Sequence, residues 1–323
     1  MTDTVTVCEC FARDGLQHEP TFVPTATKID LLETFASAGF RRIEATSYSH
    51  PKWVPAFADA SEVLGGVTRR PGVAFKATCP NPRAVERALA DLDRGVGAEE
   101  LSLLVSASES HTEKNLRTTR ARQWQRVEEM VTSANGRFRL VGVVSVAFGC
   151  PFEGHVDPGR VAEDVARFVD LGADAVTLGD TTGVATPPTV TALFRRLERS
   201  HPGLALISHF HNTRGTAVAN AVAALEAGCR HFDSAIGGVG GHPSKIGYGA
   251  GLTGNVCTED LVSLFSAMGV ETGIDLDALA SASRACEEAL GRPLHSMVAR
   301  AGFHRSAAVV RPLPHRSSEE NLP

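Results

Sequence analysis

Long apolar runs, blocks of basic residues and Cys-x-x-Cys pairs are all missing from this 323-residue sequence. The longest nearly apolar stretch, Leu140 to Cys150, is too short to span a bilayer and predicts a buried strand. Residues Met1 to Val7 contain neither a basic segment nor a long apolar core, so they do not resemble a secretory signal. We therefore expect a cytoplasmic protein with no membrane partner.

The charged residues and the cysteines exclude two further classes of protein. Thirty-two basic and 37 acidic residues give a formal charge of −5 at pH 7, and no cluster of lysine and arginine stands out. That balance lacks the electrostatic signature of a nucleic-acid binder, so we expect no nucleic-acid partner. The seven cysteines form no Cys-x-x-Cys pair, and their odd number indicates free thiols in a reducing compartment rather than a disulfide scaffold.

The sequence does contain a regular alternation of short apolar or β-branched runs with longer amphipathic segments. The predicted strands are Thr4–Phe11, Arg42–Thr46, Gly72–Ala77, Leu101–Val105, Phe138–Ala147, Ala175–Leu178, Ala205–His211 and His231–Ser234. Predicted helices between them include Lys28–Ala38, Pro82–Leu92, Gly159–Leu171, Val190–Glu198 and Thr216–Ala227. Three glycines stand where helix C-caps are expected: Gly39, Gly172 and Gly228.

Eight strand–helix pairs predict an α/β protein with a (β/α)8 TIM barrel, a fold of roughly 250 residues. No linker-like segment interrupts the series, so we expect a single domain over residues 1–303. Within it, Asp275–Leu290 is predicted as an additional C-terminal helix. Residues 304–323 are polar and without periodicity, which favours a flexible tail.

Polar residues gather where the predicted strands end. In a barrel of this kind, catalytic residues lie at the C-terminal ends of the strands. The segments in question are Arg13–Gln17, Thr46–His50 with Glu44 before it, Ser106–Asn115 and Gly179–Gly183. They supply candidates for a site at the barrel mouth.

Two histidines near the end of the seventh predicted strand form the most specific candidate motif. His209 and His211 are two residues apart, so both project to the same face of a strand. Together with an acid such as Asp14 they would make a set of two histidines and one carboxylate for a divalent cation. On spacing alone, a purely structural histidine pair remains an open alternative.

The segment from Gly237 to Asn255 holds eight glycines in nineteen residues. Dense glycine permits close backbone approach and large movement, as in a lid that carries catalytic groups, although a surface loop would look the same. Candidate functional residues in this segment are His242, Lys245, Tyr248 and Asn255. Lysines at the strand ends, Lys52, Lys114 and Lys245, are candidates for binding an anionic ligand.

These motifs together resemble the 3-hydroxy-3-methylglutaryl-CoA lyases of the DRE-TIM metallolyase superfamily. The resemblance runs through most of the chain in ordered motifs. They are Arg13-Asp14-Gly15-Leu16-Gln17, Ile43-Glu44-Ala45-Thr46-Ser47, Pro51-Lys52-Trp53-Val54-Pro55, Ser108-Glu109, Lys114-Asn115, Gly149–Gly154, Leu178-Gly179-Asp180-Thr181, the two histidines, Gly240-Gly241, and Gly254-Asn255 with Thr258–Leu261. So many motifs in order are far more specific than any one of them.

The resemblance implies both a reaction and roles for residues. It implies a metal-dependent retro-Claisen cleavage of an acyl-CoA substrate, 3-hydroxy-3-methylglutaryl-CoA, to acetyl-CoA and acetoacetate, in a homodimer. It implies that Mg²⁺ or Mn²⁺ is held by Asp14, His209, His211 and Asn255. The catalytic candidates are Arg13, which would polarise the thioester carbonyl, and the carboxylates Glu44 and Asp180. The candidates for substrate binding are Gln17, Lys52, Ser108, Asn115, Thr181 and Lys245.

The sequence departs from the family pattern at three points. His242 stands where the family has a catalytic cysteine, and the segment from there to Asn255 is longer than the family's. His242 or Tyr248 is then the candidate acid, or the longer loop adapts the pocket to another tertiary 3-hydroxyacyl-CoA or hydroxy acid. A ligand-binding homologue that has lost catalysis is a further alternative. Asn212 replaces the acid that usually follows the second histidine, which predicts a weaker metal site.

Overall fold

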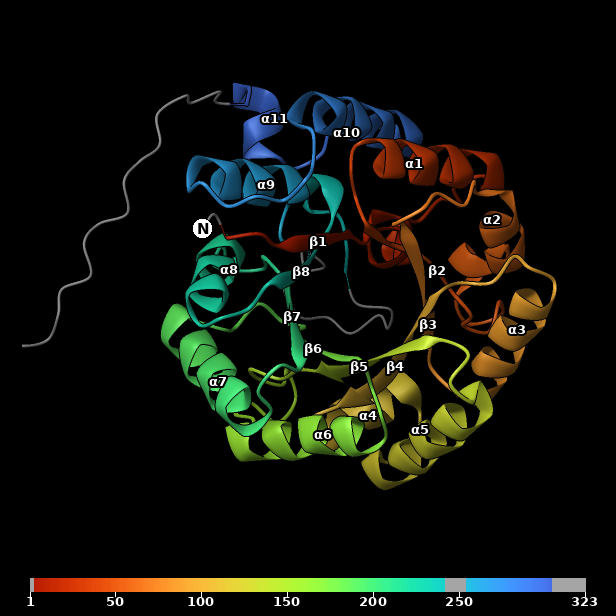
Figure 1. Ribbon diagram of the computed structural model, residues 1–323, viewed down its shortest axis with the longest axis vertical. Coiled ribbons are helices and arrows are strands. Elements are labelled where there is room, and N and C mark those ends of the chain that lie inside the picture. Colours follow the sequence, from red (N-terminus) through yellow and green to blue (C-terminus); the bar gives the residue numbers. More distant parts are fainter. Residues whose placement is uncertain (1–2, 242–253, 304–323) are drawn as a thin grey trace, which may run out of the picture.

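The computed structural model of this protein describes residues 3–241 and 254–303. Eight parallel strands close into a barrel in chain order (Figure 1). They are β1 (Thr6–Glu9), β2 (Arg42–Ser47), β3 (Ala74–Cys79), β4 (Glu100–Ser106), β5 (Arg139–Ser145), β6 (Ala175–Asp180), β7 (Ala205–Phe210) and β8 (His231–Ser234). Strand β1 pairs with β8 and closes the sheet. The predicted (β/α)8 barrel is confirmed.

Helices form a ring around the strands (Figure 1). Covering the barrel are α1 (Thr25–Ser37), α2 (Ala60–Gly66), α3 (Pro82–Asp93), α4 (Glu109–Leu116), α5 (Arg120–Ala134), α6 (Pro158–Asp170), α7 (Pro187–Ser200), α8 (Ala217–Glu226) and α9 (Thr258–Ala267). Among the described residues, four single turns lie in loops: the π-helix η1 (Phe11–Gly15) and the 3₁₀ turns η2 (Leu16–His18), η3 (Pro55–Phe57) and η4 (Ile236–Gly238).

The barrel is followed by α10 (Leu276–Leu290), as predicted, and by the short α11 (Met297–Ala301), which was not predicted. Helix α10 lies beside α1, at the place where the first and last parts of the chain meet (Figure 1). Residues 304–323 lie outside the described part of the chain, so the tail and the domain limits stay predictions.

Local sequence accounts for where the elements end and how closely they pack. Gly39, Gly172 and Gly228 have φ angles of +105°, +82° and +101° directly after α1, α6 and α8, the left-handed conformation expected of C-cap glycines. In β5, a Cβ atom on Gly142 would lie 2.4 Å from Cγ of Phe168 in α6. Only glycine at this position lets α6 approach the sheet so closely.

The interior of the barrel holds both an apolar cluster and a buried ion pair near the N-terminal ends of the strands. Near the N-terminal ends of the strands, Val141, Ala175 and Ile207 form a small apolar cluster. The buried ion pair of Arg42 with Glu100 lies at the same end, with Nη2 and Oε2 2.8 Å apart. Buried charge therefore occurs at this end of the barrel as well as at the opposite end, where Asp14 follows β1.

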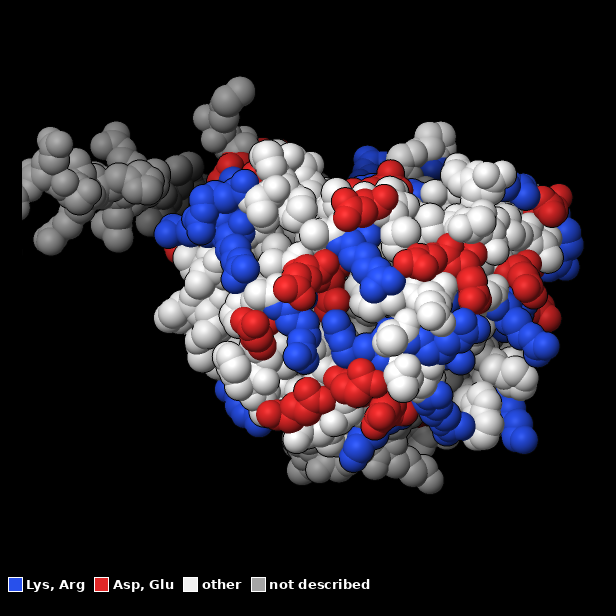
Figure 2. Space-filling view, turned by 90° about the horizontal axis from the view of Figure 1, so that it is seen from below, with Lys and Arg blue, Asp and Glu red and all other residues white. Residues whose placement is uncertain are grey.

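The outer surface mixes charges of both signs. On the face seen in Figure 2, basic and acidic side chains are interspersed and do not gather into a patch of one sign. Ion pairs such as Arg167 with Glu128, between α6 and α5, follow the same pattern. Across residues 3–241 and 254–303, no helix is both long and apolar enough to cross a membrane.

Candidate active site

The first part of the site comes from the turn that follows β1. The strand ends at Glu9, earlier than predicted, because the Glu9 side chain accepts the Phe11 N–H and the backbone turns into the π-helix η1. The N–H groups of Asp14 and Gly15 both bond to the Cys10 carbonyl, which closes this wide turn. Arg13 and Asp14 consequently lie side by side at the barrel mouth, with Arg13 Nη1 2.8 Å from Asp14 Oδ1.

The second part comes from the end of β7, where His209, in the strand, and His211, directly after it, project to the same side as predicted. The Nε2 atoms of His209 and His211 are 3.2 Å apart. Each of them lies 3.9 Å from Oδ2 of Asp14. One ligand atom from each of the three residues falls within a 4.8 Å span. Two imidazole nitrogens and a carboxylate oxygen that converge in this way fit a divalent cation.

Asn255 meets this cluster from the segment after β8. Its Nδ2 donates to Oδ2 of Asp14 at 2.7 Å and to the Val239 carbonyl at 2.9 Å. Gly240, with φ of +148°, permits this approach, since a Cβ there would lie 2.3 Å from that nitrogen. Asn255 therefore lies where a fourth ligand would stand, but its amide must rotate to present the oxygen to a cation.

The electrostatic surroundings keep Asp14 ionised. Burial by itself would raise the pKa of Asp14, but the neighbouring Arg13, His209 and His211 outweigh it and hold that pKa well below its usual range. Deprotonated carboxylate is the form that binds a metal.

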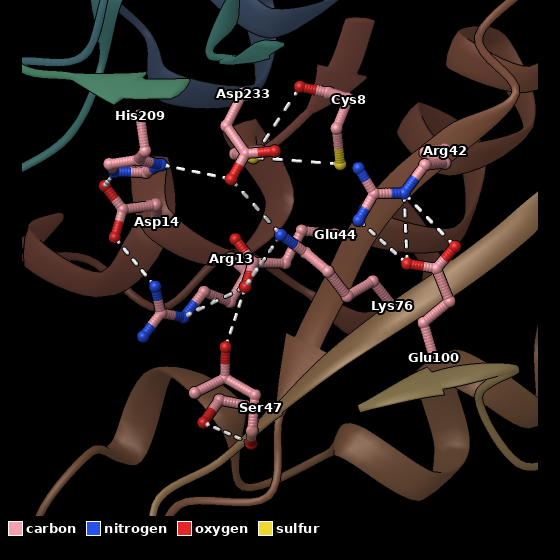
Figure 3. A network of polar contacts seen from close by, with 12 residues as sticks. Cys8, Arg13, Asp14, Arg42, Glu44, Ser47, Lys76, Glu100, His209 and Asp233 are labelled. Atoms are coloured by element: carbon pink, nitrogen blue, oxygen red, sulfur yellow. Dashed lines mark hydrogen bonds and ion pairs between the residues drawn. The ribbon is translucent and has the colours of Figure 1, made fainter. Parts of the chain in front are cut away.

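Asp233 and Lys76 were not among the predicted site residues. Asp233 Oδ2 lies 3.3 Å from Nδ1 of His209, so it orients the imidazole and leaves Nε2 for a ligand. Lys76 Nζ lies 3.5 Å from that same oxygen (Figure 3). For Lys76 the available signal was a charged residue among the mainly small and apolar residues of β3. Strand β8, with the sequence HFDS, gave no such contrast for Asp233.

Arg13 is also close to Glu44 of β2. Arg13 Nε lies 3.8 Å from Glu44 Oε1, and the Thr78 hydroxyl donates to that oxygen at 2.7 Å. Within the part of the chain that the structure describes, Arg13 Nε has no hydrogen-bond partner although it is buried. Arg13 Nε is thus available to donate a hydrogen bond to a ligand in the cavity that Arg13 lines.

A small cavity of about 80 Å³ lies between these groups. The predicted residues that line it are Arg13, Asp14, Gln17, Glu44, Asn115, Thr181, His209 and His211. Unpredicted lining residues include Lys76, Thr78, Ser102, His111, Thr177 and Asp233. Asn115 also lines an adjoining groove of about 570 Å³ between the loops after β2, β3 and β4. Basic residues of that groove are Arg83, Lys114, Arg117, Arg122 and Arg126.

Besides Asn255, three predicted residues that the structure describes do not line the cavity. The Asp180 carboxylate accepts the N–H groups of Val184 and Ala185, so it holds the loop after β6, and burial raises its pKa to about 6. The Ser108 hydroxyl caps α4 by accepting the His111 N–H. Lys52 is exposed after β2, with Nζ 5.4 Å from the centroid of the Trp53 ring.

Asn212, which was expected to orient a metal-site histidine only weakly, has a different contact in the structure. Asn212 Oδ1 accepts the Ala217 N–H at the start of α8. The carboxylate that orients a metal-site histidine is Asp233, from the neighbouring strand. His242, Lys245 and Tyr248 lie outside the described residues, so their roles stay predictions.

Comparison with known proteins agrees with this geometry. The family model described as HMGL-like matches residues 4–286. The mitochondrial hydroxymethylglutaryl-CoA lyase of Rattus norvegicus is 39% identical over 298 residues, 92% of this chain and 89% of that protein. The cytoplasmic 3-hydroxy-3-methylglutaryl-CoA lyase of the same organism is 36% identical over 304 residues, 94% of this chain and 86% of its own.

A solved structure shows the same fold at similar identity. It is an HMG-CoA lyase from A. baumannii in complex with coenzyme A and 3-methylmalate, with a TM-score of 0.88 and 40% identity, covering 97% of this chain and 98% of that one. The resemblance predicted from the motifs is confirmed, and this chain belongs to the HMGL-like family.

Proposed function

We propose that this protein is a carbon–carbon lyase that cleaves 3-hydroxy-3-methylglutaryl-CoA to acetyl-CoA and acetoacetate by metal-dependent retro-Claisen chemistry. The observation that carries the proposal is the convergence of Asp14, His209 and His211 on one point, with Arg13 beside it. Family membership and the lyases to which the chain is similar support the same activity.

The metal site would take Mg²⁺ or Mn²⁺. Asp14, His209 and His211 would hold the ion, and Asn255 would complete the set once its amide oxygen faces it. When bound, a divalent cation lowers the pKa of the substrate's tertiary hydroxyl and so eases removal of its proton.

Arg13 would act at the other end of the bond that breaks. Loss of the hydroxyl proton leads to a ketone, cleavage of the carbon–carbon bond and release of the acetyl-CoA enolate. Arg13 Nε, which has no hydrogen-bond partner among the described residues, and the guanidinium charge would stabilise that enolate oxygen as its charge develops. Glu44, which lines the cavity 3.8 Å from Arg13 Nε, would orient the guanidinium and is the carboxylate placed to handle the hydroxyl proton.

Protonation of the enolate carbon requires an acid from elsewhere. Asp14 and Asp233 are held ionised by their cationic neighbours. Burial lowers the pKa of His111 to about 4, so at neutral pH its ring has no extra proton to give. We therefore retain His242, with Tyr248 as the second candidate, as the proposed acid. A His242→Ala enzyme that turns over at the wild-type rate would remove the first of these.

The basic groove beside the cavity would bind the phosphates of the CoA moiety. It carries five cations and joins the cavity at Asn115, while Lys52 and Lys245 remain proposed phosphate contacts. In an Arg83→Gln/Arg126→Gln variant, KM for the CoA thioester should rise with kcat retained. The same variant should act normally on the N-acetylcysteamine thioester, which has no phosphates. Arg137→Gln, which removes an ion pair to Asp93, is the matched control.

The decisive assay is acetyl-CoA release from 3-hydroxy-3-methylglutaryl-CoA by the purified protein with Mg²⁺ or Mn²⁺, and with chelator. Metal-dependent release supports the proposal. Tight metal binding without cleavage would contradict it, and a panel of other tertiary 3-hydroxyacyl-CoA thioesters would then identify an altered substrate. The homodimer and the cytoplasmic location stay predictions, which sedimentation and cell fractionation would check.

A further inference from the structure

Six side chains at the barrel mouth form a closed ring in which acidic groups alternate with basic ones (Figure 3). Asp14 contacts Arg13, Arg13 contacts Glu44, and Glu44 Oε1 lies 3.7 Å from Lys76 Nζ. Lys76 then contacts Asp233, Asp233 contacts His209, and His209 Nε2 returns to Asp14 at 3.9 Å. Under the proposed function, Asp14, His209 and Asp233 belong to the metal half of the ring, and Arg13 and Glu44 belong to the half that would bind the carbonyl group.

The two halves of the ring meet at two places. One is the contact between Asp14 and Arg13, and the other is Lys76, which bridges Glu44 and Asp233. The Lys76 side chain is only 3% exposed, and its ammonium group lies between two carboxylates that are themselves buried. Each of those carboxylates uses the same oxygen for Lys76 and for a functional group: Asp233 Oδ2 also contacts His209, and Glu44 Oε1 also contacts Arg13. A displacement of the Lys76 ammonium group would therefore move the carboxylates that contact His209 and Arg13.

Removal of the ammonium group would leave two buried carboxylates facing one another across the floor of the cavity. Their mutual repulsion would be strong, because burial weakens the screening by water. Burial by itself would lower the pKa of Lys76, but Asp233 and Glu44 outweigh it and raise that pKa well above its usual range. The group is thus a permanent cation, suited to holding charge in place and unsuited to giving up a proton.

We propose that Lys76 is a positioning residue for this reaction, which holds Asp233 on the metal-binding histidine and Glu44 on the carbonyl-binding arginine. The inference rests on the proposed function for its kinetic part only. Metal binding can be measured without substrate, so failure of the lyase assay and failure of this inference are distinguishable.

The test replaces Lys76 with methionine, which keeps the length and apolar stem but removes the charge, and with arginine, which keeps the charge. Mn²⁺ affinity is measured by electron paramagnetic resonance on metal-free protein, and kcat and KM are measured separately. We expect Lys76→Met to weaken Mn²⁺ binding by about 10-fold or more, the range seen when groups that orient a ligand are removed. We expect kcat to fall by a similar factor, with KM for the thioester little changed and partial recovery in Lys76→Arg.

A matched control separates positioning from stability. Lys28 is also a buried lysine, 2.8 Å from Asp59 Oδ1, but it contacts no member of the ring. Lys28→Met should lower the thermal midpoint while Mn²⁺ affinity stays unchanged. If Lys76→Met behaves like Lys28→Met, with wild-type Mn²⁺ affinity and kcat, Lys76 is merely structural and the inference is wrong.

A double variant covers the case in which Lys76→Met does not fold. Lys76→Met/Asp233→Asn removes opposite charges together and avoids leaving Asp233 as a buried ion without its cation. If Lys76 acts on the metal through Asp233, the double variant binds Mn²⁺ about as weakly as Asp233→Asn alone. Additional weakening by 10-fold in the double variant would contradict that route.

Discussion

The link between Asp233 and His209 gives the sharpest test of the metal site. Asn at position 233 has nearly the shape of Asp but lacks the charge that holds the proton of His209 on Nδ1, 3.3 Å away. An amide can instead turn its NH₂ group to that nitrogen, which favours the tautomer with the proton on Nε2 and occupies the nitrogen that a metal needs. We expect Asp233→Asn to weaken Mn²⁺ binding by about 10–100-fold, or about 1.4–2.7 kcal/mol.

Titration of the metal-free protein with Mn²⁺, followed calorimetrically, measures this change directly. Asn212→Asp is the matched control: its side chain would still accept the Ala217 N–H and introduce no contact with His209, so the Mn²⁺ affinity should stay within about twofold. The reasoning is refuted if Asp233→Asn binds Mn²⁺ as tightly as the wild type. A tenfold gain in Asn212→Asp would instead show that position 212 controls the metal site.

Three further predictions concern stability and can be checked by thermal unfolding. Gly142→Ala should destabilise the protein by about 1–3 kcal/mol through its clash with Phe168, and Phe168→Leu in the same chain should recover part of the loss; additive losses would exclude that contact. Arg42→Met should cost about 3 kcal/mol because it leaves the buried Glu100 with only the part-exposed Arg139 as its cation, and a loss under 1 kcal/mol would contradict this. Burial raises the pKa of Glu9 to about 8, so between about pH 4.5 and 8 the folded state keeps a proton that the unfolded state has released. The free energy of unfolding should therefore fall as pH rises through that window. Glu9→Gln should reduce this dependence on pH. An unchanged pH dependence in Glu9→Gln would assign the slope to other groups.

The barrel and the histidine pair could be predicted because both depend on simple periodicities. Alternating apolar runs and amphipathic segments locate the strands, and residues two apart on a strand share a face. That rule alone placed His209 and His211 together. Their convergence with Asp14 depends on barrel closure, which brings the turn after β1 close to the end of β7.

Two predicted site residues that do not line the cavity, Asp180 and Ser108, are polar side chains at strand ends, where such groups have two chemical uses. Thr177, Gly179 and Thr181 line the cavity, so Asp180 has the opposite parity and holds its own loop by accepting backbone N–H groups. Ser108 caps a helix in the same way. From sequence alone, such a residue can be predicted either as a ligand in the cavity or as a cap for backbone N–H groups. The register of the strand determines which of the two it is.

The wide turn after β1 had no signature in the periodicity. A π-helix of five residues interrupts the alternation that the strand begins, so the predicted strand ran on through Phe11. Lys76 was missed for a related reason: a lysine in a strand usually faces solvent, and the inward orientation follows only from the closed barrel and two buried carboxylates that accept its charge.

The metal site joins parts of the chain that are made at very different times. Asn255 and Asp14 are hydrogen-bonded across 241 positions of sequence, and β1 finds its second neighbour only when β8 is present. During synthesis, β1 therefore keeps one edge unpaired, and Asp14 lacks its partners from β7 and from the segment after β8, until almost the whole barrel has left the ribosome. Appearance of the Mn²⁺ signal in a refolding or translation time course would accordingly report the closing step of folding, independent of any substrate.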